Sequence, residues 1–354
     1  MAIPAGNMAD RERNIMRKNT SGLSRNKLCK AGLIASIAIA TGSAITTCAL
    51  AQDYPDRAIR LIVPYPAGGP TDTLGRALGE GFRERTKHGF VVENRPGANT
   101  SMGAMACKGS DADGYTLCLL ASTTLSINPH LYQNLRYKPT DLAPVSNVAT
   151  TRAVFLVHKD VPVTNLKELV EYSKKNPEKM NYGSFGVGGE THLMVEWLKN
   201  KTGAQITHVP FTGFAPAIQS FDRNDIQVMI PVAVPPILDR IEKKQAKPLF
   251  ILGDNRAANM PSVPSIVDLG LPPINFQTWF GMFAPAGTPP DRIERASSLI
   301  REITSKKEFV DKFLTGSGFV PAANTPAQFK AFLEKDNLAA QELVKISGVK
   351  LTAE

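Results

Sequence analysis

Residues 63–72, VPYPAGGPTD, end a short apolar run with prolines, two adjacent glycines and an aspartate. The run itself, Arg60–Val63, is typical of a buried β-strand, and Asp72–Thr86 has the residue spacing of a helix. Glycines at such a junction leave backbone N–H groups accessible at the helix start, where the partial positive charge favours an anion. The alternative interpretation is that these glycines only permit a tight turn.

Two later stretches repeat this arrangement. Residues 182–192, YGSFGVGGETH, and residues 209–217, VPFTGFAPA, each run from a strand through glycines into a helix. In open α/β sheets, ligands bind at the edge where strands lead into helices. Three such loops in one chain therefore favour an anion-binding site over three unrelated turns.

The chain after residue 51 alternates between short apolar runs and longer helical patterns. About 300 residues exceed what one hydrophobic core usually holds, so two α/β lobes are expected. Apolar runs without alternation predict mainly parallel sheets covered by helices on both faces. The expected strands are 60–63, 90–92, 115–120, 153–157, 180–182, 206–209 and 226–230. The expected helices are 72–86, 101–107, 165–175, 191–201, 214–221, 290–304, 308–314 and 326–346.

The N-terminus has the parts of a secretory signal peptide. Arg25, Lys27 and Lys30 precede an apolar stretch at 31–45, and an A-x-A pattern ends at Ala51. We expect cleavage after Ala51 and export to the periplasm. A membrane anchor would need a longer apolar run, and a lipoprotein modified at Cys48 is a further alternative. Met1, Met8 and Met16 all remain possible start sites.

The net charge and the cysteine content limit the classes of partner and of site that are expected. Removal of residues 1–51 takes away seven basic and two acidic residues, which reduces the formal net charge from +9 to +4. Nucleic acid is therefore not an expected partner, whereas a small anion is. The remaining cysteines, Cys107 and Cys118, are expected to form a disulfide in an oxidising compartment. A reactive thiol or metal site is the alternative, but no histidine lies at zinc-ligand spacing from them, and no metal is expected.

Several motifs together resemble one family, the periplasmic substrate-binding proteins of tripartite tricarboxylate transporters, or Bug proteins. They are YPDR with IRLIVP before AGGxxD at 54–72, ENRPGA at 93–98, DGYTL at 113–117, NYGS at 181–184, VPFxG at 209–213, and WFG before APAGTP at 279–289. The resemblance implies a two-lobe, type II periplasmic-binding fold, with residues 52–151 and 276–354 in one lobe and 152–275 in the other. It also implies a monomer that binds one small organic anion, a carboxylate or acidic amino acid, and delivers it to membrane transporter subunits. Neither catalysis nor a cofactor is implied.

The resemblance also implies where the ligand binds. In such proteins the ligand's carboxylate is held by backbone N–H groups, hydroxyls and waters of these loops. The residues that match are Ala67, Gly68, Gly69, Thr71, Asp72, Ser122, Thr123 and Thr124 on the first lobe, and Ser184, Phe185, Gly186, Val187, Gly188, Thr191, Phe211, Thr212 and Gly213 on the second. The lobes are expected to hinge about chain crossings near residues 150 and 275.

Individual residues in these loops have two interpretations. Asp72 either caps a helix that begins at Thr73, or orders its loop and faces the ligand. Where many relatives have Ser-Pro, this chain has Gly189-Glu190; Glu190 either complements its own helix N-terminus, which we favour, or pairs with a ligand ammonium. Phe185 and Phe211 serve as core or as apolar walls, with core favoured. His192 is expected to be packed or solvent-facing rather than a ligand.

Two other function classes remain as alternatives. A sensor lobe for a signalling membrane partner would have the same pocket. An enzyme acting on a small carboxylate is less favoured, because the sequence has neither a G-x-S-x-G nucleophile turn nor a G-x-x-x-x-G-K-[ST] phosphate loop. The sequence does not identify the ligand, since the far wall of the pocket determines which acid fits.

Overall fold

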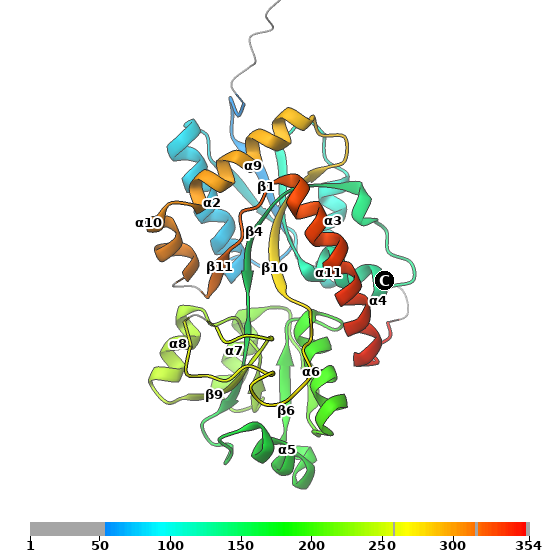
Figure 1. The fold of residues 1–354 in the computed structure, drawn as a ribbon, viewed down its shortest axis with the longest axis vertical. Helices are drawn as coiled ribbons and strands as arrows, with labels where there is room; N and C mark the ends of the chain where they lie inside the picture. The colour runs from blue at the N-terminus through cyan, green and yellow to red at the C-terminus, as the bar shows by residue number, and fades with distance from the viewer. Residues whose placement is uncertain (1–53, 258, 316–317, 352–354) are drawn as a thin grey trace, which may run out of the picture. The chain divides into compact units, whose positions relative to one another are not determined.

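The computed structural model describes residues 54–257, 259–315 and 318–351, which form two β-sheets with helices packed around each (Figure 1). The expected signal peptide, its cleavage after Ala51 and the alternative at Cys48 lie outside the described residues. Within the described ranges, no helix has both the length and the apolar character needed to cross a membrane.

The first sheet has six strands in the order β11-β4-β10-β3-β1-β2. Strands β1 and β2 are parallel, as are β1 and β3, whereas β10 is antiparallel to both β3 and β4, and β11 is antiparallel to β4. The bounds are β1 (Ile59–Val63), β2 (Phe90–Asn94), β3 (Thr116–Ala121), β4 (Leu142–Thr151), β10 (Thr278–Pro285) and β11 (Phe319–Pro321). We call this sheet and its helices the first lobe.

The second sheet has five strands in the order β7-β6-β8-β5-β9. Strand β6 is parallel to β7 and β8, and β5 is antiparallel to β8 and β9. The bounds are β5 (Ala153–His158), β6 (Asn181–Ser184), β7 (Thr207–Pro210), β8 (Val228–Met229) and β9 (Ala246–Leu252). The chain enters this second lobe through one residue, Arg152, between β4 and β5, and returns between β9 and β10.

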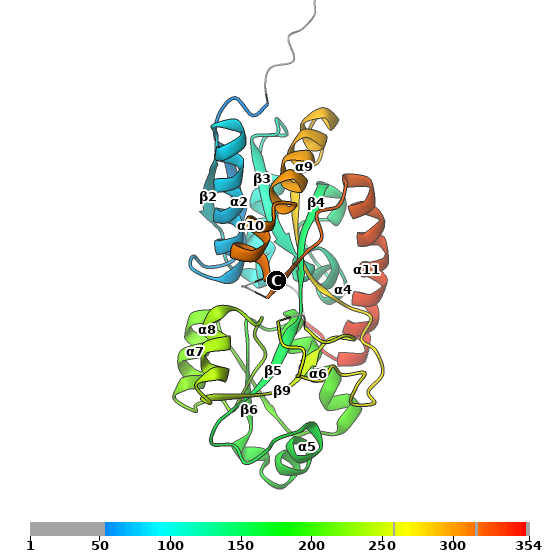
Figure 2. The same cartoon turned by 60° about the vertical axis from the view of Figure 1, so that its left-hand side comes forward.

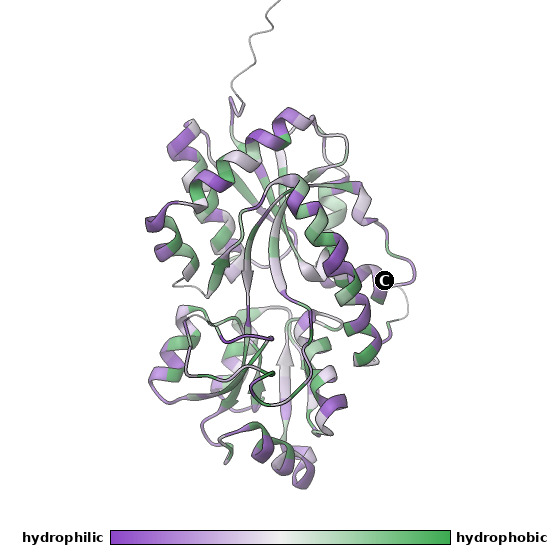
Figure 3. Ribbon diagram, viewed as in Figure 1, coloured by the Kyte–Doolittle hydropathy of each residue, from purple (hydrophilic) through white to green (hydrophobic). Residues whose placement is uncertain are grey.

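Amphipathic helices cover both sheets, with polar faces outward (Figure 3). Local signals define their ends: Asn165 accepts the Glu168 N–H at the start of α5, and α11 begins with a capping box of Thr325 and Gln328. The helices are α2 (Pro70–Thr86), α3 (Ser101–Lys108), α4 (Asn128–Leu131), α5 (Leu166–Lys175), α6 (Glu190–Thr202), α7 (Phe214–Asp222), α8 (Pro235–Glu242), α9 (Pro290–Thr304), α10 (Lys307–Phe309) and α11 (Pro326–Ser347). Short 3₁₀ turns lie at Ala98–Thr100 (η1), Pro139–Asp141 (η3) and Pro177–Lys179 (η4), and π turns at Thr123–Ile127 (η2) and Val310–Leu314 (η5).

The α/β two-lobe fold is confirmed, but both sheets are mixed rather than mainly parallel. The expected strands and helices are present with small shifts in their ends, and all of these strands except β5 take part in parallel pairs. The prediction omitted β4, β9, β10, β11, α4 and α8. All four omitted strands pair antiparallel, because they are the segments that cross between the lobes or close the sheet edges.

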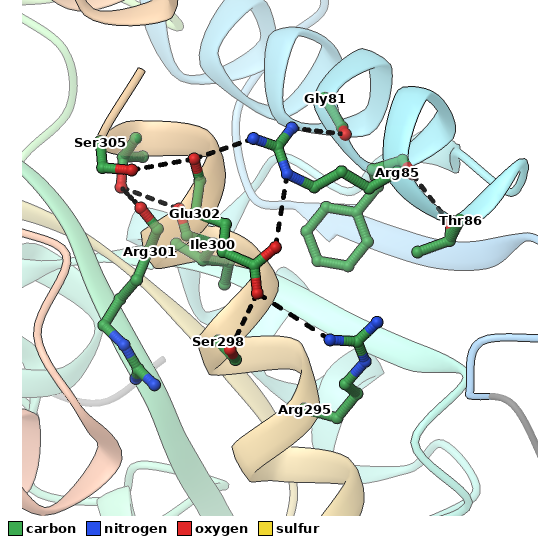
Figure 4. A network of polar contacts seen from close by, with 11 residues as sticks. Gly81, Arg85, Thr86, Arg295, Ser298, Ile300, Arg301, Glu302 and Ser305 are labelled. Carbon is green, nitrogen blue, oxygen red and sulfur yellow. Dashed lines mark hydrogen bonds and ion pairs between the residues drawn. The ribbon is translucent and has the colours of Figure 1, made fainter. Parts of the chain in front are cut away.

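After β10 the chain returns to the outer face of the first lobe, where α9 packs beside α2 (Figure 4). The mostly buried guanidinium of Arg85 on α2 donates to the Glu302 carbonyl oxygen at 2.8 Å and to the Gly81 carbonyl at 3.3 Å. The Glu302 carboxylate forms longer ion pairs with Arg85 and Arg295, at 3.7 Å and 3.9 Å. Arg85 therefore ties the C-terminal end of α2 to α9.

The long helix α11 contacts both lobes (Figure 2). Phe329, near its start, packs with Trp279 and Phe283 of β10 in the first lobe. Ala340 and Leu343, near its end, belong to one buried cluster with residues of α6 in the second lobe. Helix α11 is thus a second connection between the lobes, besides the two chain crossings.

Cys107 of α3 and Cys118 of β3 are joined by a disulfide, with 6.2 Å between their Cα atoms. Both residues are fully buried beside Leu120 and Trp279. The bond therefore fastens α3 to the middle of the first sheet, as the cysteine content predicted.

We expect no free thiol in the exported protein, and a lower stability without the bond. A thiol titration of protein purified from the periplasm after expression of the full chain should find none under denaturing conditions. The double variant Cys107→Ser/Cys118→Ser should lose roughly 3 kcal/mol of unfolding free energy in denaturant titrations, because the closed loop spans 11 residues. Two titratable thiols in the parent would contradict the disulfide.

Candidate functional site

The candidate site lies where parallel strands end and helices begin. In the first lobe, β1 leads to α2 and β3 leads to the π turn η2; in the second lobe, β6 leads to α6 and β7 to α7. The first N–H groups of each helix have no acceptor within the helix, so they can receive an anion. Helices α2, α6 and α7 each begin after a glycine, respectively Gly69, Gly189 and Gly213.

These loops of the two lobes contact one another. A Cβ placed on Gly213 would lie 3.3 Å from Cγ of Pro66 in the β1–α2 loop. A Cβ on Gly186 or Gly189 would lie 3.7 Å or 3.6 Å from the side-chain oxygen of Asn99 in η1. The structure therefore brings the predicted loops at 66–72, 184–191 and 211–213 together at one boundary between the lobes.

Asp72 orders the β1–α2 loop. Helix α2 begins at Pro70, so the expectation that Asp72 caps a helix starting at Thr73 is wrong; it lies inside the first turn, 3% exposed. Its carboxylate accepts the Gly68 N–H at 2.9 Å, Nδ2 of Asn94 at 3.0 Å and Nε of Arg76 at 3.0 Å. Burial opposes ionisation, but these hydrogen bonds, led by Arg76, outweigh it and lower the pKa of Asp72. Its loop-ordering role is confirmed.

The hydroxyls after β3 have separate roles. Thr124 Oγ1 lies 2.7 Å from Thr100 Oγ1, and the Thr124 carbonyl accepts the Tyr137 hydroxyl, so Thr124 supports the wall from within the first lobe. Ser122 instead donates across to the second lobe. Thr123 hydrogen-bonds the Tyr65 phenol, whose pKa is raised by burial and by the nearby Glu190 carboxylate.

In the second lobe, two stacked histidines hold the loop after β6. The rings of His192 and His208 are 3.9 Å apart and nearly parallel. Nδ1 of His192 accepts the Gly188 N–H at 2.9 Å, and Nε2 of His208 lies 2.6 Å from Ser184 Oγ. Burial lowers the pKa of both histidines, and proximity to His192 helps to lower that of His208 to about 4. Both rings are therefore neutral near pH 7, which Nδ1 of His192 needs in order to accept.

The phenylalanines of the loops after β6 and β7 pack as core. Phe185 and Phe211 lie against the buried cluster around Phe221 and Ile226, and Phe185 also contacts Phe214 at 6.2 Å between ring centres. Thr212 and Val187 are exposed, and Thr191 is buried in the first turn of α6. Gly188 has φ +76°, and a Cβ there would come within 2.3 Å of Leu131, so a side chain would push the lobes apart.

Glu190 connects the two lobes directly. From the first position of α6, its Oε2 accepts the Ser122 hydroxyl at 2.8 Å and its Oε1 accepts the Thr278 hydroxyl at 3.0 Å. Burial raises the pKa of Glu190 to about 7, despite the two hydroxyl hydrogen bonds, and the Asp336 carboxylate adds to the rise. The favoured interpretation, that Glu190 serves its own helix N-terminus, missed this: both side-chain hydrogen bonds go to the first lobe.

A second buried carboxylate supports the site from behind. Asp336 of α11 accepts Nε1 of Trp279 at 2.6 Å and the Ser126 hydroxyl at 2.5 Å, and burial raises its pKa to about 6. It thus fixes η2, which directly follows Ser122, and the start of β10, which contains Thr278. Sequence analysis also missed Tyr65, Asn99 and Thr278; the position of Thr278 beside Glu190 becomes recognisable only once strand β10 is placed.

Two surface hollows lie elsewhere. One is between α2, α9 and α10, and the other is beside α5. Neither includes a residue of the loops described above. At the first hollow the Arg85 side chain is already paired with Glu302. Neither hollow is part of the candidate site.

Comparison with known proteins identifies the family of this chain and supports its fold. Residues 74–349 match the family described as the tripartite tricarboxylate transporter family receptor. The chain belongs to this receptor family. It is 32% identical to BugT of Bordetella pertussis over 85% of this chain and 92% of that protein. Among solved structures, BugD shares 28% identity at a TM-score of 0.77, covering 84% of this chain and 99% of BugD. The R. palustris protein Rpa4515, solved with adipate, shares 28% at a TM-score of 0.79, with 84% and 99% covered. The Bug-type resemblance is thereby confirmed.

Glu190→Gln should change how stability depends on pH. A carboxyl with a folded-state pKa of about 7 and an ordinary value of 4.5 binds its proton more tightly when folded, so the parent loses stability as pH rises between these values. Glutamine can keep both hydroxyl contacts without charge. We expect the variant to gain roughly 1 kcal/mol or more over the parent at pH 8, and little at pH 4.5. Urea titrations at both pH values test this, with the exposed Glu171→Gln as a control; an equal difference at both pH values would refute the assignment.

Proposed function

We propose that this receptor captures a small organic carboxylate between its lobes in the periplasm and presents the closed form to a membrane transporter. The observation that carries the proposal is the convergence of helix N-termini from both lobes. Loops before α2 and α7 meet at Pro66 and Gly213, and loops around η2 and α6 meet through Ser122 and Glu190.

The donors at this boundary suit a carboxylate. They are the backbone N–H groups in the first turns of α2, α6 and α7, which have no acceptor within their helices. We assign the ligand-binding role to the loop residues predicted from sequence and add Tyr65 and Thr278. Adipate in the related R. palustris structure supports a carboxylate as the class of ligand.

Closure of the lobes is the proposed capture step. We place the hinge at the two chain crossings, near Arg152 and in the segment before β10, which the sequence placed near residues 150 and 275. Helix α11 packs on both lobes and would restrain their separation on its own side. The lobes would then open on the side where Pro66 meets Gly213, and a membrane partner would recognise the closed arrangement.

Binding is favoured over catalysis by the state of Ser184, the one hydroxyl paired with a histidine in these loops of the described chain. Ser184 is buried, and its single proton can be donated to the Gly186 carbonyl at 3.0 Å; in that arrangement Nε2 of His208 donates to Ser184 and does not activate it. A nucleophile needs the opposite arrangement, with the histidine accepting.

A thermal-shift screen tests the class of ligand. Carboxylates, amino acids, phosphates and neutral sugars should be compared at matched concentrations, and we expect Tm to rise with one group of carboxylates, because a ligand that binds only the folded state stabilises it. A rise with phosphates or sugars alone would contradict the proposal.

Asp72→Ala should weaken binding of the acid found in that screen. Loss of the carboxylate leaves the Gly68 N–H and the Asn94 amide without their acceptor and releases the β1–α2 loop. We expect a loss of about tenfold or more in affinity, with the protein still folded. Asp72→Asn, which keeps one acceptor oxygen, is the matched control and should lose less. Unchanged affinity in Asp72→Ala would remove that loop from the site.

A further inference from the structure

Glu190 is an acidic side chain inside a site that otherwise consists of donors for an anion. It has two hydroxyl partners, and the ion pairs within residues 54–257, 259–315 and 318–351 do not include it. A carboxylate that is mostly enclosed and lacks a cation is unfavourable when ionised. An acidic residue in a first helical turn can stabilise its own helix. That role does not explain why both hydrogen bonds of the Glu190 carboxylate go to the first lobe.

The groups around Glu190 leave it without positive charge. Ser122 approaches from the end of β3, Thr278 from the start of β10, and the Tyr65 phenol from the β1–α2 loop. Asp336 on α11 is a second acid, and His192, two residues along α6, is neutral. Burial, with a smaller contribution from the Asp336 carboxylate, raises the pKa of Glu190 to about 7 despite its two hydroxyl hydrogen bonds, so near neutral pH it exists in both protonation states.

We propose that Glu190, with Ser122 and Thr278, binds a cationic nitrogen of the ligand, so that the receptor takes an amino-carboxylate rather than a plain carboxylic acid. The inference rests on the carboxylate-binding function proposed above and narrows its ligand class. An ammonium group has three donors and no acceptor. Oxygens of Glu190 accept from it with charge assistance, and the Ser122 and Thr278 hydroxyls, which donate to Glu190, keep lone pairs that can accept as well.

A ligand with a second carboxylate in place of the ammonium group would interact differently with Glu190. A plain dicarboxylate that placed its second carboxylate here would meet a like charge, unless Glu190 were protonated first. Binding of an ammonium therefore favours ionised Glu190 and releases a proton, whereas binding of a second carboxylate favours protonated Glu190 and takes a proton up. The sign of proton exchange thus reports which group faces Glu190.

Isothermal titration calorimetry at pH 7, in two buffers of different ionisation enthalpy, measures both affinity and proton exchange. The probes are pairs that differ only in the amino group: aspartate and succinate, glutamate and glutarate, phenylalanine and 3-phenylpropanoate. For at least one pair we expect the amino acid to bind about tenfold or more tightly than its partner and to release up to about half a proton. The protein should be purified from the periplasm after expression of the full chain.

Two variants distinguish an effect of the Glu190 charge on binding from an effect on folding. Glu190→Gln should lose about tenfold in affinity for the amino acid, lose the proton release, and bind the partner acid as well as or better than the parent. Glu171→Gln, an exposed substitution on α5 in the same lobe, should change neither value. The Tm of each variant verifies folding.

Two results would overturn the inference, and they differ. Binding of plain acids with proton uptake, and tighter binding in Glu190→Gln, would refute the ammonium site while leaving the carboxylate-binding function intact. Failure of both members of every pair to bind the parent would refute the inference together with the function on which it rests.

Discussion

The pairing of β4 with β10 is the constraint on which the rest of this structure depends. The two strands run antiparallel in the first sheet, and Thr151 of β4 lies opposite Thr278 of β10 where the chain crosses between lobes. One residue after Thr151 the chain enters β5 of the second sheet. This pairing therefore sets the second lobe against the first, and it places the Thr278 hydroxyl where Glu190 can reach it.

The hydrogen-bond donors of the resulting site are uncharged, and the Glu190 carboxylate lies among them. Helix starts and hydroxyls supply partial charges, and Asp72, His192 and His208 hold loops in place. Selectivity would then depend on few charged groups. Glu190 differs from the other acids of these loops in that its partners lie across the lobe boundary. Under the proposal made above, its charge would therefore act on both ligand choice and the contact between lobes.

Sequence patterns predicted the parallel part of the fold because most strands there are short apolar runs, and β1, β6 and β7 are each followed by glycine and a helix. They missed β4, because it buries polar residues: Ser146 and the Asn147 N–H bond to Asn324, and the Asn147 side-chain oxygen is buried without a partner among the described residues. They missed β10 because Gly281, where the Phe329 ring packs closely, interrupts the pattern of a strand. The hydrogen-bond partners of Glu190 could not be predicted from sequence patterns, because Ser122 and Thr278 are 68 and 88 residues away in sequence.

The position of β10 also bears on how the chain folds. In the first sheet it lies between β3 and β4, yet it follows them in sequence by more than 120 residues, after the whole second sheet. A growing chain can therefore form the second lobe while the edge of β3 still lacks its partner strand, and such unpaired edges invite association with other chains. Contacts between segments so distant in sequence form slowly. The first sheet can be completed only when residues up to Pro285, which follow the whole second sheet in the chain, are available to pair.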